Sequence, residues 1–187
     1  EKKGFVWPDL PMLEYLLANL QLQAADYGAA QQAIEKALSI WPDEPRWKAL
    51  AARIKMEAPA ANQSQQLSEA TGLLEQAADL EPDHSPHFLE LGKLYLQSSQ
   101  TKRALQALEQ AVRLSPSDSA AWFYLATVQD LRGDTEEAAL SAEKAVETSD
   151  EPLEASCLRA NLAIKSGNHR AGMNWAQEIL QSHPEHP

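Results

Sequence analysis

Apolar residues in this chain recur three or four positions apart, which is the spacing of one face of a helix. Two such series follow one another between Pro86 and Ser115, and neither alternates as a strand would. Their members are Phe88, Leu91 and Tyr95, then Leu105, Leu108, Ala111 and Val112. The pattern predicts two amphipathic helices separated by a short turn.

This pair of series returns at a step of 34 residues, as from Phe88 to Trp122 to Ser156. Other positions coincide at the same step: Leu91, Leu125 and Arg159; Gly92, Ala126 and Ala160; Ala104, Ala138 and Gly172; Ala111, Ala145 and Ile179; Pro116, Asp150 and Pro184. A fixed period of this size indicates helix pairs that bury their apolar faces only by stacking on their neighbours. The sequence therefore predicts an all-α solenoid.

Residue types also place the helix boundaries. Gly133 and Gly167 fall in the middle of a unit, where glycine can take the left-handed conformation that closes a helix. Asp134 is expected to begin the second helix of its unit. Ser85 and Asp118 are expected to begin first helices, because their side chains can accept the free amides of a first turn.

One block carries a bulky residue, Leu-Gly, Tyr, Ala, a large apolar residue, Ala and Pro at fixed spacings. The matching residues are Phe88, Leu91, Gly92, Tyr95, Ala104, Leu108, Ala111 and Pro116. This pattern resembles the tetratricopeptide repeat. The small residues Gly92 and Ala104 are expected where two helices approach closely. The resemblance implies a right-handed α-solenoid of antiparallel helix pairs, a tetratricopeptide superhelix.

The resemblance extends over most of the chain as about five units. After an extended N-terminal segment, residues 1–10, a single array is predicted over residues 11–187. Its repeats are residues 11–44, 45–84, 85–118, 119–152 and 153–186. The second repeat has an insertion near residues 57–66, where the apolar period is lost, and we expect a lengthened helix or loop there. Ala25 stands where a turn glycine is usual.

Composition and charge reduce the number of function classes that fit the chain. The chain has 187 residues, of which 44% are apolar, and a formal net charge of -11. An acidic chain lacks the cationic surface that a general nucleic-acid binder needs. Common signatures of metalloproteases, phosphate-binding loops, redox cysteine pairs and serine hydrolases are not present in the sequence. We therefore expect no enzyme activity, no cofactor and no nucleic-acid partner.

The histidines and the single cysteine are the candidate chemical sites of the chain. His84 and His87, with Glu81 nearby, could ligate a metal if one helix carried both rings. Ser85 marks a helix start between them, so His84 is expected in the turn, pointing elsewhere, and no metal is predicted. Cys157 is expected to be a small, partly buried side chain and not a nucleophile.

The sequence is compatible with more than one cellular compartment. No stretch of about 18 uncharged apolar residues is present, so direct membrane insertion is not expected. A single cysteine favours the cytoplasm weakly, and a periplasmic protein can also carry one thiol.

A candidate binding surface comes from the resemblance, which implies a concave wall formed by the first helix of each unit. Residues on the face opposite the second helix are predicted to line a peptide groove: Tyr15, Asn19, Leu22, Lys48, Lys55, Leu89, Lys93, Leu96, Phe123, Thr127, Asn161 and Lys165. Acidic residues gather instead on second helices: Glu35, Glu75, Glu109, Glu136, Glu143 and Glu147. This segregation favours a partner protein segment with acidic and apolar residues. The alternative is a solvated face on which lysine stems cover apolar neighbours.

One known version of such a groove is excluded by residue identity. Tetratricopeptide proteins that dock on chaperone tails use a clamp of lysine, asparagine and arginine on three consecutive first helices. Asn19 matches one member, but Tyr15, Pro86 and Glu90 occupy the other places. The clamp is therefore absent.

Two further interpretations stay open. The last predicted helix carries an apolar stripe without a polar closing helix: Met173, Trp175, Ala176, Ile179 and Leu180. Because terminal repeats normally need a polar outer face, this stripe favours a structural or self-assembly role. The lengthened second unit is also similar to helical-repeat proteins of bacterial cytochrome c maturation, which bind tails of client proteins in the periplasm.

Overall fold

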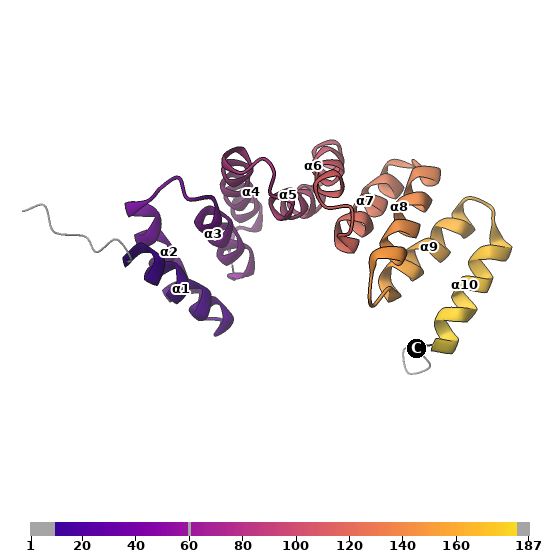
Figure 1. Ribbon diagram of the computed structural model, residues 1–187, viewed down its shortest axis with the longest axis horizontal. Helices are drawn as coiled ribbons and strands as arrows, with labels where there is room; N and C mark the ends of the chain where they lie inside the picture. Colours follow the sequence, from indigo (N-terminus) through magenta and orange to yellow (C-terminus); the bar gives the residue numbers. More distant parts are fainter. Residues whose placement is uncertain (1–9, 60, 183–187) are drawn as a thin grey trace, which may run out of the picture. The chain divides into compact units, whose positions relative to one another are not determined.

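The computed structural model describes residues 10–59 and 61–182, and within these ranges the chain is helical and contains no strand. Short turns join the helices in sequence (Figure 1). The helices are α1 (Leu10–Gln23), α2 (Tyr27–Ile40), α3 (Pro45–Glu57), α4 (Gln63–Leu80), α5 (Ser85–Gln97), α6 (Thr101–Leu114), α7 (Ser119–Arg132), α8 (Thr135–Thr148), α9 (Leu153–Lys165) and α10 (His169–Ser182). Most of the predicted N-terminal segment, residues 1–9, lies outside the described residues.

By its internal contacts the chain divides into two compact units, Glu1–His87 and Phe88–Pro187. In the first unit α1 packs on α2, α2 on α3 and α3 on α4. In the second unit α6 packs on α7, α7 on α8, α8 on α9 and α9 on α10. Helices thus pack on their neighbours in chain order, which confirms the predicted all-α solenoid of helix pairs.

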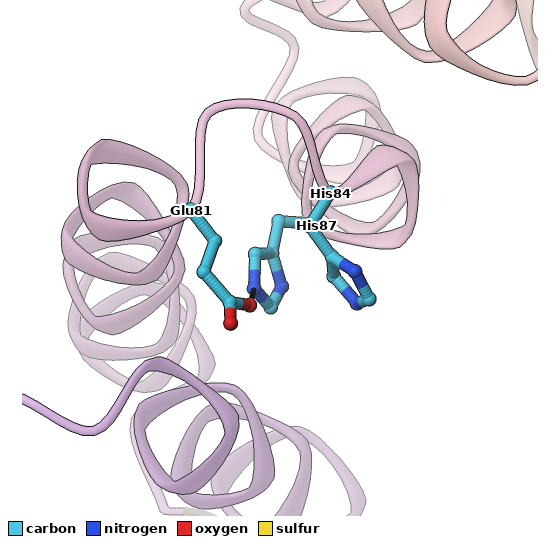
Figure 2. A group of neighbouring side chains, drawn as sticks. All are labelled: Glu81, His84 and His87. Carbon is cyan, nitrogen blue, oxygen red and sulfur yellow. Dashed lines mark hydrogen bonds and ion pairs between the residues drawn. The ribbon is translucent and has the colours of Figure 1, made fainter.

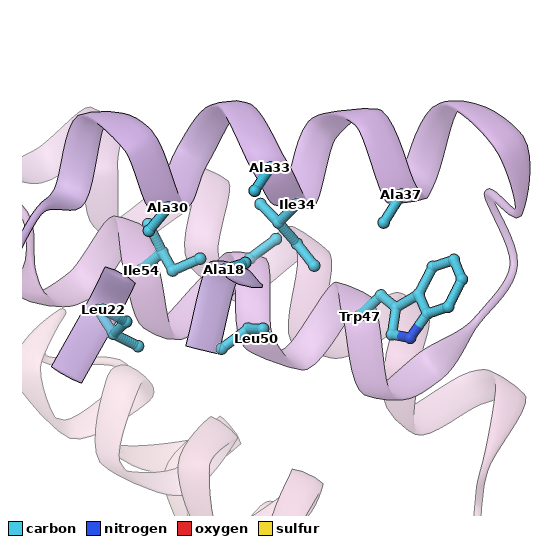
Figure 3. Packing of buried hydrophobic residues seen from close by; sticks show 10 residues of the cluster. Ala18, Leu22, Ala30, Ala33, Ile34, Ala37, Trp47, Leu50 and Ile54 are labelled. Carbon is cyan, nitrogen blue, oxygen red and sulfur yellow. The ribbon is translucent and has the colours of Figure 1, made fainter. Parts of the chain in front are cut away.

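Small and large residues interlock in the core of the first unit, which joins side chains from α1, α2 and α3 (Figure 3). Alanines provide the close approaches, and three larger side chains from α3 fill the space between them: Trp47, Leu50 and Ile54. The indole of Trp47 is 2% exposed and stacks on Trp41, with ring centroids 5.3 Å apart. Leu22 also belongs to this core and is 5% exposed. Its prediction as a groove residue is therefore wrong, because its side chain points at α2 and α3.

Two helix crossings depend on the absence of a side chain. A Cβ atom added at Gly92 would lie 2.5 Å from Cγ of Leu108, which is fully buried. A Cβ atom at Gly172 would lie 2.6 Å from Cγ1 of Ile164 and 2.9 Å from the backbone oxygen of Ala160. Gly92 therefore sits where α5 meets α6, as the sequence predicted, and Gly172 sits where α10 meets α9.

Among residues 10–59 and 61–182, four turns contain a residue in the left-handed region. Gly133 and Gly167 have φ values of 86° and 84°, as predicted from their positions. Ala25 and Ser99 have φ values of 56° and 58°, so they adopt the same backbone conformation with a side chain attached. Left-handed geometry costs more at such residues than at glycine.

Predicted helix starts differ in how they are capped. Oδ1 of Asp118 accepts hydrogen bonds from the amides of Ala120 and Ala121, at 3.0 and 3.2 Å, which confirms it as the cap of α7. Asp134 precedes α8 as expected but makes no side-chain cap. Its carboxylate pairs instead with Nε of Arg132 at 3.0 Å.

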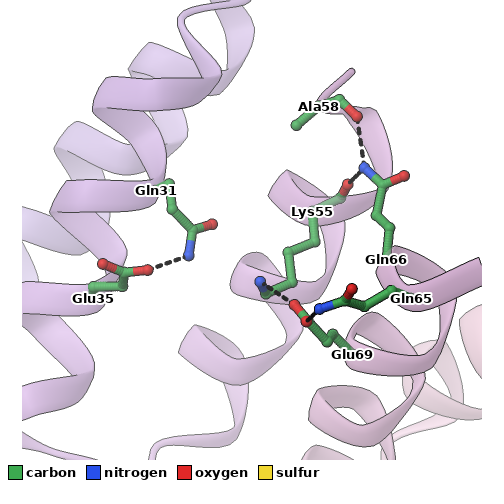
Figure 4. Close-up of polar contacts among 7 residues, drawn as sticks. All are labelled: Gln31, Glu35, Lys55, Ala58, Gln65, Gln66 and Glu69. Atoms are coloured by element: carbon green, nitrogen blue, oxygen red, sulfur yellow. Dashed lines mark hydrogen bonds and ion pairs between the residues drawn. The ribbon is translucent and has the colours of Figure 1, made fainter. Parts of the chain in front are cut away.

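The insertion in the second repeat is both a connection and a longer helix. Helix α3 ends at Glu57 and α4 begins at Gln63 and runs for 18 residues, against 13 for α3. The Gln66 side chain donates to the backbone oxygens of Ala58, at 2.6 Å, and Lys55 (Figure 4). These bonds tie the start of α4 to the end of α3.

Among the described residues, no helix has both the length and the apolar character needed to span a membrane.

Candidate functional site

Helix α1 presents two of its predicted groove residues at the surface. Tyr15 is half-buried, with its ring centroid 6.2 Å from that of Trp47. Oδ1 of Asn19 accepts a hydrogen bond from Nη2 of Arg53 on α3 at 2.8 Å. Both side chains are therefore held in place by α3.

The two predicted lysines of α3 face its partner helix. Nζ of Lys48 donates to Oε1 of Gln76 at 2.7 Å, and the lysine is 9% exposed. Nζ of Lys55 pairs with Oε2 of Glu69 at 2.7 Å, as Figure 4 shows. The hydrogen bond from Lys55, with a second from Gln65, lowers the pKa of Glu69 below its ordinary value. Both partners lie on α4, so the expectation that these lysines point away from the second helix is wrong.

The lysines of the second unit also have partners. Nζ of Lys93 contacts Oε1 of Glu90 at 2.8 Å and lies 5.8 Å from the ring centroid of Tyr124. Nζ of Lys165 pairs with Oδ2 of Asp130 at 2.6 Å, which links α9 to α7. Each predicted groove lysine therefore already contacts an acceptor within its own unit.

A hollow lies where α7, the end of α8 and the start of α9 meet. Its volume is about 850 Å³, and we call it the aromatic hollow after two of its lining residues, Phe123 and Tyr124. Their rings meet edge to face with centroids 5.4 Å apart. Other lining residues include the acids Asp150, Glu151 and Glu154. The hollow thus combines an aromatic wall with a concentrated negative charge.

The sequence predicted only part of this site. Phe123 was on the predicted wall, but Tyr124 and the three acids were missed. A signal was present in the run from Asp150 to Glu154, where two acids precede Pro152 in the turn before a first helix. The remaining predicted groove residues do not line the hollow. Leu89 and Leu96 are half-buried, and Asn161 is exposed. The hydroxyl of Thr127 donates to the backbone oxygen of Phe123 at 2.9 Å.

Helix α1 carries an exposed apolar surface that the repeat pattern did not predict. Four leucines spaced three or four apart form what we call the leucine face: Leu13, Leu16, Leu17 and Leu20, with exposures of 59%, 49%, 45% and 63%. Leu125 holds the position in α7 that Leu17 holds in α1, yet it is 4% exposed. The difference arises because α6 precedes α7 and packs on it, whereas no described helix precedes α1.

Glu81, His84 and His87 form a second polar group, which we call the histidine cluster (Figure 2). Nε2 of His87 lies 3.1 Å from Oε2 of Glu81, and the rings of His84 and His87 have centroids 4.4 Å apart. Burial lowers the pKa of His87, and the hydrogen bond to Glu81 opposes that shift. The expectation that His84 points elsewhere is wrong, because the residue before a helix and the residue three positions later lie close together across the first turn.

Sequence comparisons identify the repeat. Family models described as the tetratricopeptide repeat match residues 89–152 and 15–44. A search of curated protein sequences found no significant match.

Similar solved structures agree on the fold. MamA from Desulfovibrio magneticus RS-1 is 16% identical, with a TM-score of 0.83 over 97% of this chain and 100% of that one. YrrB, described as a tetratricopeptide protein with an unusual peptide-binding site, is 20% identical, with a TM-score of 0.76 over 92% and 86%. TTC0263 from Thermus thermophilus is 18% identical, with a TM-score of 0.66 over 94% and 93%. Together with the stacked helix pairs, the two family matches show that the chain belongs to the tetratricopeptide repeat family.

Proposed function

We propose that this tetratricopeptide scaffold acts without catalysis and binds an extended segment of a partner protein through the first helices of the unit Phe88–Pro187. The aromatic hollow carries the proposal. Its volume, about 850 Å³, falls within the roughly 300–1,000 Å³ that is usual for ligand-binding clefts. Aromatic residues in such hollows supply much of the binding energy of protein interfaces. Phe123 and Tyr124 are therefore the expected anchors.

Charge around the hollow bears on the partner's sequence. The lysines led us to expect an acidic partner. Its carboxylates would have to displace Glu90 from Lys93 and Asp130 from Lys165. Exposed ion pairs contribute only about 0–1 kcal/mol, so such exchange would add little affinity. Three acids lie at the hollow itself: Asp150, Glu151 and Glu154. We therefore propose a segment with an apolar residue for the aromatic rings and a basic residue beside it.

One comparison and one sequence resemblance bear on the form of the segment. YrrB has this fold and is described as having a peptide-binding site, so a peptide ligand is compatible with the architecture. The lengthened second repeat resembles tail-binding proteins of cytochrome c maturation, which makes a free chain terminus one version of the segment. Peptide libraries with blocked and with free C-termini separate these two versions.

Selection from a displayed peptide library tests the proposal. We expect enriched peptides to pair an apolar residue with lysine or arginine, and Phe123→Ala to weaken their binding at least about tenfold, the usual effect of losing a central aromatic anchor. Leu131→Ala is the matched control, because Leu131 lies on the same helix, is 68% exposed and does not line the hollow. Enrichment of acidic peptides would support the lysine wall instead. Equal loss of binding in Phe123→Ala and Leu131→Ala, or no loss in either, would refute the hollow as the binding site.

End-to-end self-association is a second candidate function, favoured by the leucine face. Inside each unit a second helix packs on the next first helix, as α2 does on α3 and α8 on α9. Helix α1 is a first helix with an exposed apolar face, and α10 is a second helix whose Met173 and Leu180 are 58% and 61% exposed. A second copy could continue the stack through this pair, which would be a head-to-tail contact able to extend.

Light scattering at several concentrations distinguishes this candidate. If copies stack, the average mass rises with concentration, and Leu16→Glu with Leu20→Glu restores the monomer. Both leucines are exposed, so the substitutions leave the core intact. A constant monomer mass over the whole range would exclude self-association, and it would leave the peptide proposal unaffected.

A further inference from the structure

We propose that the histidine cluster, Glu81, His84 and His87, binds a divalent transition-metal ion, with Zn²⁺ as the ion that suits its donors best. The three side chains offer two imidazole nitrogens and one carboxylate oxygen, and these atoms lie within 4.8 Å of one another. Two histidines and one glutamate are the protein ligands of a well-known class of zinc site. This site is separate from the aromatic hollow and does not depend on the proposed function.

Backbone hydrogen bonds place the three residues at regular steps. The amide of Glu81 donates to the oxygen of Ala77 at 2.9 Å, which closes α4. The amide of His84 then donates to the oxygen of Glu81 at 3.1 Å, and the amide of His87 to that of His84 at 3.2 Å. The donors therefore lie on two successive backbone turns, the connection from Glu81 to His84 and the first turn of α5, each bonded through its backbone to the next. This arrangement brings the three side chains together before any ion binds.

Little movement is needed to form a coordination shell. With metal–ligand bonds of about 2.0–2.1 Å, donors around a tetrahedral ion lie roughly 3.3 Å apart. Nε2 of His87 and Oε2 of Glu81 are already 3.1 Å apart. His87 is 4% exposed and so fixed by its surroundings, whereas His84 is exposed and its ring can turn. Figure 2 shows the carboxylate of Glu81 directed at His87, with the ring of His84 beside it.

The donor set also indicates the kind of ion and its coordination. Imidazole suits Zn²⁺, Cu²⁺ and Ni²⁺, whereas Mg²⁺ and Ca²⁺ prefer shells made only of oxygen. One carboxylate from the cluster, with Asp83 in the same turn, supplies negative charge near the ion. Three protein ligands leave a fourth position for water or for a donor from another molecule. An ion held there would join the end of α4 to the first turn of α5.

Isothermal titration of Zn²⁺ into the untagged chain tests the proposal. His183 and His186 would add background binding, so all proteins carry His183→Ala and His186→Ala. We expect one Zn²⁺ per chain, bound at least about tenfold more weakly in His84→Ala and in Glu81→Gln, because each removes a ligand and even the loss of a ligand's hydrogen-bond partner costs about 10–100-fold. His169→Ala is the matched control: it also removes a histidine beside a helix start, but one outside the cluster. His87 is left intact because its burial makes a substitution there a risk to folding.

Cobalt substitution adds a readout of geometry. Co²⁺ bound by the cluster in a four-coordinate shell gives intense visible absorption bands, and His84→Ala is expected to abolish them while circular dichroism shows unchanged helicity. No stoichiometric heat with Zn²⁺ would overturn the proposal. So would unchanged affinity in both His84→Ala and Glu81→Gln, or a loss in His169→Ala as large as that in His84→Ala.

Discussion

Gly92→Ala is expected to destabilise the second unit, although alanine is the better helix former. The new Cβ atom would lie 2.5 Å from Cγ and 2.6 Å from Cδ2 of Leu108. Ordinary carbon contacts are about 3.5–4.0 Å, so the leucine would have to move by about 1 Å. Leu108 is fully buried, and Cγ is the branch point of its side chain, so no flexible end can yield.

The magnitude follows from two opposing terms. Overpacking of a core costs about 1–3 kcal/mol, and replacing glycine by alanine in a helix interior gains about 0.5–1 kcal/mol. The free energy of unfolding should therefore fall by about 1 kcal/mol, within a range of about 0–2.5 kcal/mol. Urea denaturation followed by far-ultraviolet circular dichroism measures the change.

Gly72→Ala is the matched control, because Gly72 lies inside α4 with no atom within 4 Å of the added Cβ position. It should stabilise the protein by about 0.5–1 kcal/mol. In a Leu108→Ala background the contacting atoms are gone, so Gly92→Ala should become neutral or stabilising. If Gly92→Ala stabilises the parent protein as much as Gly72→Ala does, the close approach of α5 and α6 is refuted.

Three further predictions concern helix ends and the last crossing. Ala25→Gly should raise the free energy of unfolding by about 0.5–1 kcal/mol, since glycine tolerates the positive φ. A lower free energy of unfolding in urea denaturation would contradict the left-handed turn. Asp118→Ala should lower it by about 1 kcal/mol through loss of the α7 cap, whereas Asp134→Ala, which removes no cap bond, should lower it less. Gly172→Ala should loosen α10, because its Cβ would meet the backbone oxygen of Ala160; amide hydrogen exchange that stays unchanged along α10 would count against that crossing.

The fold could be predicted because its main signals are local. Gly133 takes the left-handed conformation at a turn, and Gly92 lacks a side chain at a helix crossing. Each of these features depends only on the type of one residue and on its position in the 34-residue repeat. Repeats make those signals stronger, since each packed unit resembles the next. The helix pairing of the chain follows from the same period.

Candidate sites were harder to predict because they depend on where side chains turn. Lys48 and Lys55 have the right helix and spacing for a groove, yet both reach back to α4, where an amide oxygen and a carboxylate oxygen accept their hydrogen bonds. His84 was expected to point away, but its place before α5 brings its ring to His87. Leu17 follows the repeat pattern and is still exposed, because burial at that position comes from a neighbouring helix and not from the residue itself.

The most direct test of partner binding by the aromatic hollow is photo-crosslinking. A peptide selected on the chain would carry a photoreactive phenylalanine at its apolar anchor position, and mass spectrometry would locate the attachment. Crosslinks at Phe123, Tyr124 or Leu153, which line the hollow, are predicted, with their loss in Phe123→Ala. Crosslinks confined to second helices, at residues such as Glu109 or Leu140, would contradict the assignment.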